Sequence, residues 1–233
     1  MSCDAFGDCG SQKITVIGHG DSDDVPASNA NVIYEYAPGG SSLGEGHLVV
    51  PAPKPQHGGT VSIGVESEAT GLRPWEDACS SPCLIFMQAV HDRLMEQTYT
   101  GDYSPQMAES LTPNDDYTVW TMVLRSGITF SNGDALNAQT IADMFPIQQT
   151  GAVSAGPVGR SGLVGVEAVG DLTVEYTLSA TNVAFAGELA LQGLGMVFHP
   201  GLAASDPEGY TMNPIGTGAF ILETRDIDNE TVF

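Results

Sequence analysis

The chain has 233 residues, enough for one large domain or two small ones, and its 29 acidic residues face only 7 lysines and arginines. The resulting net charge of −22 repels phosphate backbones and anionic lipid, which disfavours nucleic acid and membrane surfaces as partners. No run of about 18 apolar residues occurs, so the sequence predicts no membrane span. The acids are scattered, which is typical of a solvating surface rather than of a metal-binding run.

Residues 1–57 are expected to form a flexible leader or linker. They show little periodicity, carry a stiff proline-rich spacer at 51–55, and lack the basic and apolar regions of a complete signal peptide. Cys9 matches a lipid-attachment cysteine only in part, because Asp8 precedes it. A truncated or mis-assigned start is the alternative interpretation.

Two cysteines, Cys79 and Cys83, lie four residues apart with Pro82 bending the chain between them. The pair is too isolated to supply the four ligands, or three plus water, that zinc requires. A small disulfide and two free buried thiols both stay open as interpretations. The disulfide would place the chain in an oxidising compartment, outside the cytoplasm.

Regular structure is predicted from Gly58 onward, from alternating apolar residues for strands and from helical spacing for helices. In chain order, the expected elements are a strand at 60–65, a loop at 66–75, a helix at 84–95, strands at 117–124 and 127–130, a turn at 131–134, a helix at 137–144, a loop at 151–165, a hairpin of 166–169 with 173–178, a helix at 183–191, strands at 196–198 and 218–223, and a hairpin that ends at 233. Pro82 is expected at the start of the first helix, Asn137 to cap the second and Pro146 to end it. Strands and helices without strict βαβ alternation indicate a mixed α+β or irregular α/β fold.

The sequence contains no catalytic or metal-binding pattern. Its five histidines include no pair at metal-ligand helical spacing, and neither a G-x-S-x-G nucleophile elbow nor a phosphate-binding loop occurs. His91 and Asp92 are interpreted as a solvated or capped pair on the first helix, and His199 as a loop residue. We therefore expect no enzyme, no resident metal and no cofactor.

Four motifs occur in an order that is typical of one known family. They are G-G-T at 58–60, A-E-S-L-T-P-N-D-D-Y-T-V-W-T-M-V-L-R continued by S-G-I-T-F-S-N-G-D-A-L-N-A at 108–138, D-L-T-V-E-Y-T-L at 171–178, and N-P-I-G-T-G-A-F at 213–220. Together they closely resemble extracellular solute-binding protein family 5, the oligopeptide-, dipeptide- and nickel-binding components of ABC importers. The pattern departs from the family at Leu111, where tryptophan is usual, and in the turn at 132–135, where the family's D-G-x-P reads N-G-D-A, so that Asn132 and Ala135 differ.

The resemblance implies a periplasmic-binding-protein type II-like α/β clamp that closes on its ligand. It implies that 58–98 and 187–233 belong to an incomplete first lobe and 99–186 to an inserted subdomain. Family members continue past the last motif into a second lobe that carries most ligand contacts. We therefore expect this N-terminal fragment alone to bind solute weakly or not at all.

The 108–138 motif is interpreted as structural, a strand at 119–124 buried on both faces. Solute contact is expected from two loops instead. The loop at 66–75 lies where α/β sheets usually bind ligands, and Gly216, Thr217 and Gly218 offer backbone N–H groups and a close approach. The residues expected at the site are Glu66, Ser67, Glu68, Trp75, Gly216, Thr217 and Gly218. For Trp75, packing in the core is an equally good interpretation.

The leading hypothesis is an extracytoplasmic solute-binding subunit that delivers peptides, or a similar small solute, to ABC permease subunits. The alternatives are a hydrolase whose catalytic residues lie beyond the C-terminus and a purely structural envelope module. Saturable binding of a peptide pool favours the first, and turnover of a peptide favours the second.

Overall fold

The computed structural model describes residues 62–65, 69–227 and 229–233, so the expected leader at 1–57 lies outside the described residues. Ile63–Phe233 form one compact unit. Its elements are α1 (Ser81–Val90), β1 (Met95–Gln97), β2 (Tyr103–Pro105), β3 (Ala108–Pro113), β4 (Val119–Leu124), α2 (Ala138–Gln148), α3 (Ala155–Ser161), β5 (Leu163–Ala168), β6 (Thr173–Leu178), α4 (Phe185–Glu188), α5 (Gln192–Gly195), α6 (Pro200–Ser205), a 3₁₀ turn (Gly209–Thr211), β7 (Thr224–Asp226) and β8 (Glu230–Val232). Among the described residues, no helix has the length and apolar character needed to cross a bilayer.

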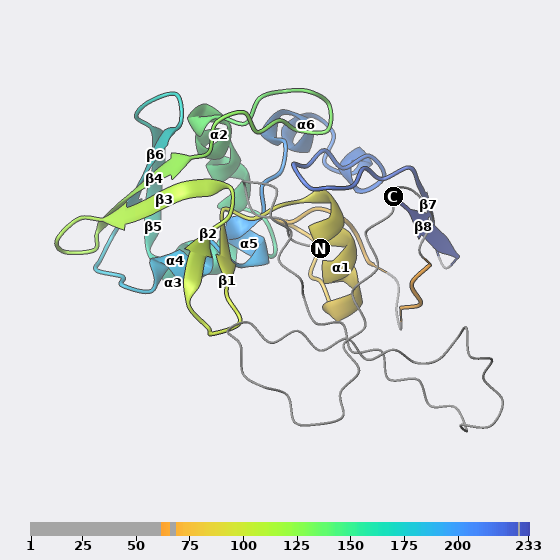
Figure 1. Cartoon of the computed structure of the whole chain (residues 1–233), viewed down its shortest axis with the longest axis horizontal. Helices are drawn as coiled ribbons and strands as arrows, with labels where there is room; N and C mark the ends of the chain where they lie inside the picture. The colour runs from red at the N-terminus through yellow and green to blue at the C-terminus, as the bar shows by residue number, and fades with distance from the viewer. Residues whose placement is uncertain (1–61, 66–68, 228) are drawn as a thin grey trace, which may run out of the picture. The chain divides into compact units, whose positions relative to one another are not determined.

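The centre of the unit is a four-stranded antiparallel sheet in the order β3-β4-β6-β5, with α2 beside it in Figure 1. Every second side chain of β4 and β6 is buried, including Met122 and Val174, which are cross-strand partners. Val119, Thr121 and Val123 on the other face are only half-buried. The expectation that 119–124 is buried on both faces is therefore wrong, because an antiparallel sheet needs cover on only one face.

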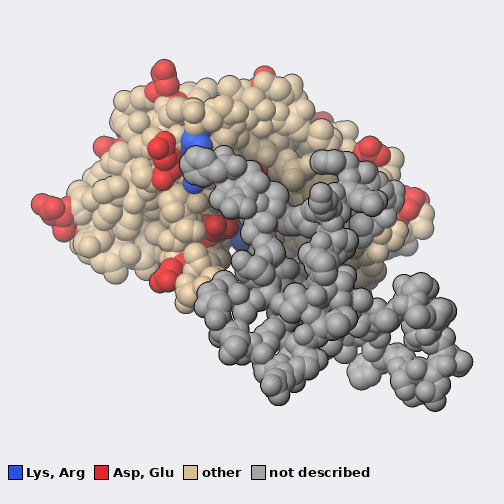
Figure 2. Space-filling view, viewed as in Figure 1, with Lys and Arg blue, Asp and Glu red and all other residues tan. Residues whose placement is uncertain are grey.

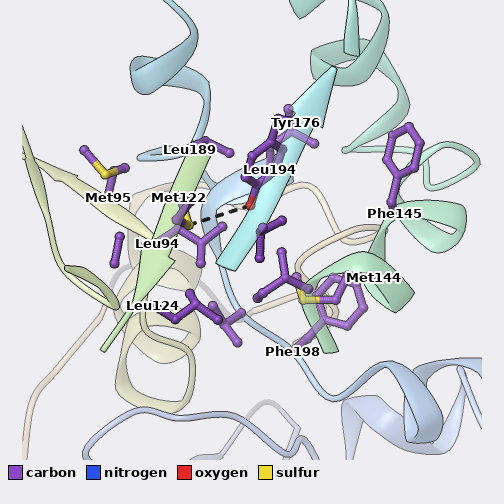
Figure 3. Close-up of a cluster of buried hydrophobic side chains, with 14 of the residues drawn as sticks. Leu94, Met95, Met122, Leu124, Met144, Phe145, Tyr176, Leu189, Leu194 and Phe198 are labelled. Carbon is purple, nitrogen blue, oxygen red and sulfur yellow. Dashed lines mark hydrogen bonds between the residues drawn. The ribbon is translucent and has the colours of Figure 1, made fainter. Parts of the chain in front are cut away.

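The buried face of the sheet packs into one large apolar cluster with side chains from α2 and from the segments around α4 and α5. Figure 3 shows Met122, Tyr176, Met144 and Leu194 converging there, with the Tyr176 hydroxyl donating to Met122 Sδ at 3.8 Å. A second, smaller cluster lies between α1 and the chain before it. Its fully buried members are Ala69, Leu72, Cys83, Met87 and Met196.

The first helix begins as predicted, with Pro82 in its first turn, but it ends at Val90 rather than at 95. His91 leaves the helix in an extended conformation, with φ −117° and ψ 117°. Leu94 N–H then donates to Gly195 O, and Met95 N–H donates to Leu189 O at the start of β1. These long-range backbone bonds override the helical spacing of the apolar residues.

The helix predicted at 137–144 is confirmed, and Asn137 caps it by accepting from Thr140 N–H at 2.9 Å. Pro146 does not end α2, which continues to Gln148. Proline removes one helical hydrogen bond, and within the last turn that loss is small compared with the burial of Phe145 and Gln148. The hairpin of 166–169 with 173–178 is confirmed as β5–β6, and the final hairpin as β7–β8.

Several expected elements differ because tertiary contacts decide them. The loop at 151–165 contains α3 and the start of β5, since Gly162 ends α3 at φ 75° and Val158 is buried. The helix at 183–191 shortens to α4. The strands at 127–130 and 196–198 reduce to isolated bridges, and 218–223 is no strand. At 62–65, the described part of the first expected strand, Ile63 is 69 % exposed, and no ladder partner occurs among the residues that the structure describes.

Candidate functional site

The first expected solute loop divides into two parts. Glu66, Ser67 and Glu68 lie outside the described residues. The part from residue 69 onward is tied down at several points. Trp75 O accepts from Val153 N–H at 3.0 Å and from Ser154 N–H at 3.2 Å. This part of the loop is therefore fixed by backbone contacts to the segment before α3.

Charged and amide side chains tie the same loop internally and to α5. Arg73 makes a two-pronged contact with Asp77, at 2.8 and 3.0 Å, and a further ion pair with Glu208 at 2.8 Å. These carboxylates raise the pKa of Arg73, so its positive charge is secure. Gln192 Nε2 donates to Pro74 O and Asp77 O at 3.2 and 2.7 Å. The loop has little freedom to close on a solute by itself.

Trp75 lies in an aromatic centre rather than at a surface. It is 4 % exposed, and its ring centroid lies 4.5 Å from that of Phe198 and 5.0 Å from that of Tyr210. The sequence left core packing and solute contact open for Trp75, and in the structure the side chain is packed in the core. Solute contact by Glu66, Ser67 and Glu68 of the same loop stays a prediction.

Gly216 and Gly218 lie against the C-terminal end of α1. Gly218 N–H donates to Val90 O at 2.8 Å, and Phe220 N–H donates to Ala89 O at 3.0 Å. This segment therefore supplies donors to carbonyls in the last turn of α1, which have no partner inside the helix. A Cβ on Gly216 would lie 2.0 Å from Val90 O, and one on Gly218 2.5 Å from Ala89 O. The glycines allow a close backbone approach, which in this structure is made to α1; their contact with a solute stays a prediction.

His91 is fully buried beside the same glycines, which corrects its interpretation as part of a solvated or capped pair on a helix. Its Nδ1 lies 3.2 Å from Val197 O and its Nε2 3.3 Å from Leu72 O. The ring also stacks on Tyr210, with centroids 5.9 Å apart. Burial lowers the pKa of His91 to about 4, although the two carbonyls favour the charged form. The ring is therefore a neutral structural group at pH 7.

Asp92, Gln106 and Thr217 form a polar cluster next to this centre, and sequence reasoning missed Gln106 altogether. Gln106 Nε2 donates to Asp92 Oδ1 at 3.3 Å, and Gln106 Oε1 accepts from Arg93 N–H at 3.1 Å. Burial raises the pKa of Asp92, and the Thr217 hydroxyl beside it opposes that rise. Arg125 Nε donates to Gln106 O at 2.8 Å. Gln106 thus contacts Arg125 of the longest motif through its carbonyl, and through its side chain it bonds Asp92, the neighbour of Thr217 in the last motif.

His199 lies outside regular structure, as predicted, and it also serves as the N-cap of α6. Its Nδ1 accepts from Leu202 N–H at 3.2 Å, and its Nε2 lies 2.9 Å from Asp134 Oδ2. With Nδ1 acting as an acceptor, Nε2 is the ring nitrogen that faces Asp134 as a donor. The contact joins α6 to the turn predicted at 131–134, which the structure confirms.

The described part of the chain contains no cluster of three or more His, Cys, Asp or Glu side chains able to hold a metal ion. Figure 2 shows acidic side chains spread over the visible face, with few lysines or arginines among them.

Cys79 and Cys83 are joined as a disulfide, with 5.1 Å between their Cα atoms. The arrangement offers hydrogen-bonding and packing groups rather than an assembled acid, base and nucleophile.

The model of bacterial extracellular solute-binding proteins, family 5 (middle region), matches residues 102–233. The chain belongs to this family. Among curated proteins, the nickel-binding periplasmic protein of Escherichia coli K12 is 29 % identical over 159 residues, which cover 66 % of this chain and 30 % of that protein. The chain therefore spans about a third of the length of such relatives.

Two solved structures show the shared fold. The unliganded open form of the murein tripeptide binding protein MppA of E. coli has a TM-score of 0.64 at 19 % identity, covering 72 % of this chain and 36 % of that one. The periplasmic binding protein DppA of Helicobacter pylori, in complex with the peptide STSA, has a TM-score of 0.61 at 20 % identity, covering 71 % and 36 %. The mixed α/β, periplasmic-binding-protein fold predicted from sequence is confirmed. These matches give the hydrolase alternative no support.

Proposed function

We propose that this chain forms part of the extracytoplasmic solute-binding subunit of an ABC importer, and that its solute is a peptide captured by clamp closure. The family match over residues 102–233 carries the proposal, since the family is defined by solute binding. Two structures of similar fold are described as binding a murein tripeptide and the peptide STSA, and on these we propose a peptide rather than the nickel named for the curated relative. The permease subunits of the importer are the proposed protein partners.

Within such a clamp, we propose that 58–98 and 187–233 belong to the first lobe and 99–186 to an inserted subdomain. The solute would then meet the loop that carries Glu66, Ser67 and Glu68 and the segment 216–218. Because the described part of the first loop and α1 are fixed by many hydrogen bonds, this region acts as the rigid half of the clamp. Closure is the movement of the remaining portion of the protein against it.

The test is to purify the gene product from its native host and identify what it carries. Native mass spectrometry followed by denaturation should release one or a few short peptides in near-stoichiometric amounts. A nickel complex or another small solute in their place would keep the solute-binding role and reject the peptide. A protein that carries no solute and gains no thermal stability from peptide pools, nickel complexes or sugar pools would reject the role itself.

A further inference from the structure

The N-terminus of α1 has Pro82 in its first turn but no side-chain acceptor for its first free amides. The first amides of a helix have no partner inside the helix and normally need a side-chain acceptor. Ser80 occupies the N-cap position with φ −74° and ψ 172°, yet its side chain makes no capping bond, and the first turn contains no acidic residue. In α2, by contrast, the Asn137 side chain caps the Thr140 amide.

We propose that the disulfide between Cys79 and Cys83 serves as a covalent N-cap for α1, and that its reduction unlocks the first helical turn without unfolding the rest of the unit. The bond joins the residue before Ser80 to the third residue of the helix. It therefore fixes the chain entry and the first turn relative to each other by a covalent tether, where an ordinary cap holds them by a hydrogen bond from a first-turn amide. The chain would then sense the thiol–disulfide state of its surroundings at this one turn.

The different burial of the two cysteines determines which sulfur atom an external thiolate attacks first. Cys79 is partly exposed, whereas Cys83 is 1 % exposed within the second apolar cluster. A thiolate of an external dithiol attacks Cys79 Sγ, and Cys83 leaves as a thiolate that takes up a proton. The second thiolate of the dithiol then displaces Cys79, which is protonated in turn. The bridge gains two electrons and two protons, and the dithiol becomes a cyclic disulfide.

After reduction, the two cysteines have different fates. Cys83 Sγ already lies 3.6 Å from Gly71 O, so its new S–H group finds an acceptor without moving. Cys79 belongs to the segment that enters the helix, and its release lets residues 79–81 leave the helical path. The first amide that depends on this turn is Leu84 N–H, which donates to Ser80 O at 3.1 Å.

The effect is confined because independent contacts hold both sides of the turn. The preceding loop stays fixed through Gln192 and through Trp75 O, and the other end of α1 stays fixed through Gly218 and Phe220. None of these contacts uses the disulfide. Reduction should therefore raise the opening frequency of the first turn of α1 and leave the sheet and α2 as they were.

Hydrogen exchange followed by mass spectrometry, on the intact chain with and without dithiothreitol, tests this proposal. The amides of Leu84 and Ile85 should exchange at least about tenfold faster after reduction, while amides 141–145 of α2 keep their rates. Iodoacetamide labelling of Cys79 and Cys83 only after reduction confirms the state of the bond. The double variant Cys79→Ala/Cys83→Ala should exchange like the reduced chain and no longer respond to dithiothreitol, which excludes effects through Cys3 and Cys9.

A rescue variant tests whether a side-chain cap can replace the disulfide at the start of α1. Ser80→Asp in the double-alanine background supplies a carboxylate acceptor at the N-cap position and should slow the exchange of Leu84 and Ile85 again. Asn137→Ala is the matched control, since it should speed exchange at the start of α2 regardless of dithiothreitol. Unchanged exchange at Leu84 on reduction would overturn the proposal. Equal acceleration in α1 and α2 would overturn it as well, because the bridge would then stabilise the whole unit.

Discussion

The four-stranded sheet with α2 and the region around α1 are held together in different ways. The sheet region depends on buried side chains, with Met122, Val174 and Tyr176 on one face and α2 covering them. The region around α1 has a smaller apolar cluster and depends in addition on close backbone approaches, on loop hydrogen bonds and on one disulfide. Side-chain patterns can specify the first kind of structure, whereas the second kind requires segments distant in sequence to fit each other.

The largest effect is expected from Gly216→Ala in the α1 region. The added Cβ would lie 2.0 Å from Val90 O, a backbone atom that cannot move without disturbing α1. We expect a loss of about 4 kcal/mol or more in the free energy of unfolding, comparable to severe overpacking. Urea denaturation followed by circular dichroism measures it.

Gly159→Ala is the control for that substitution. Gly159 lies in the helix α3, and a Cβ there meets no atom within 4 Å. The change should stabilise the chain by up to about 1 kcal/mol, because alanine is the better helix former. If both variants lose stability equally, the close approach at Gly216 is not what restricts that position.

The sheet region should instead be most sensitive to truncation of buried side chains. Met122→Ala removes a fully buried side chain and should cost about 2–5 kcal/mol. Val123→Ala, on the half-buried opposite face of the same strand, should cost less than half as much in the same denaturation assay. A larger loss for Val123→Ala would mean that the second face of the sheet is covered after all.

The pH dependence of stability should carry a contribution from His91 in the α1 region. The folded pKa of about 4 lies below the usual 6.5, so the unfolded chain takes up the proton first. The stabilisation is complete above pH 6.5 and is lost as pH falls toward 4, by about 3 kcal/mol. His91→Gln should flatten this part of the stability profile. An identical slope in the variant would assign the acid sensitivity to other groups.

The smallest effect is expected from Asn137→Ala at the start of α2. The variant loses the acceptor of the Thr140 amide and should be less stable by about 1 kcal/mol. Gln139→Ala, an exposed neighbour in the same turn, should change stability by less than about 0.5 kcal/mol. Equal effects would show that the Asn137 side chain is not what begins the helix.

Much of the sheet region could be predicted because a strand buried on one face requires apolar residues at every second position of the sequence. The strands at 119–124 and 173–178, the hairpin to β5 and the cap at Asn137 follow from alternation and capping chemistry. The extent of α1 could not be predicted, since its end depends on carbonyls of Leu72 and Val197 that hold His91. Likewise, no pattern near Gly216 indicates that its close approach is to a helix end.

The candidate site was predicted less completely than the fold. Motif order identified the family. The glycines at 216 and 218 were expected to let a solute approach closely, which stays a prediction, and the structure has them against the end of α1. The polar cluster of Asp92, Gln106 and Thr217 could not be predicted, because its members come from three separate segments and carry no spacing signal. A glutamine before a strand is ordinary, and only the folded chain brings it to Asp92.

The most direct test of the solute-binding role incubates the gene product from its native host, freed of endogenous ligand, with a defined pool of short peptides. The retained and filtered fractions are then compared by mass spectrometry. The account predicts that a subset of intact peptides is retained in saturable amounts and that no cleavage products appear. Cleavage of peptides without retention would contradict it and would favour an enzyme.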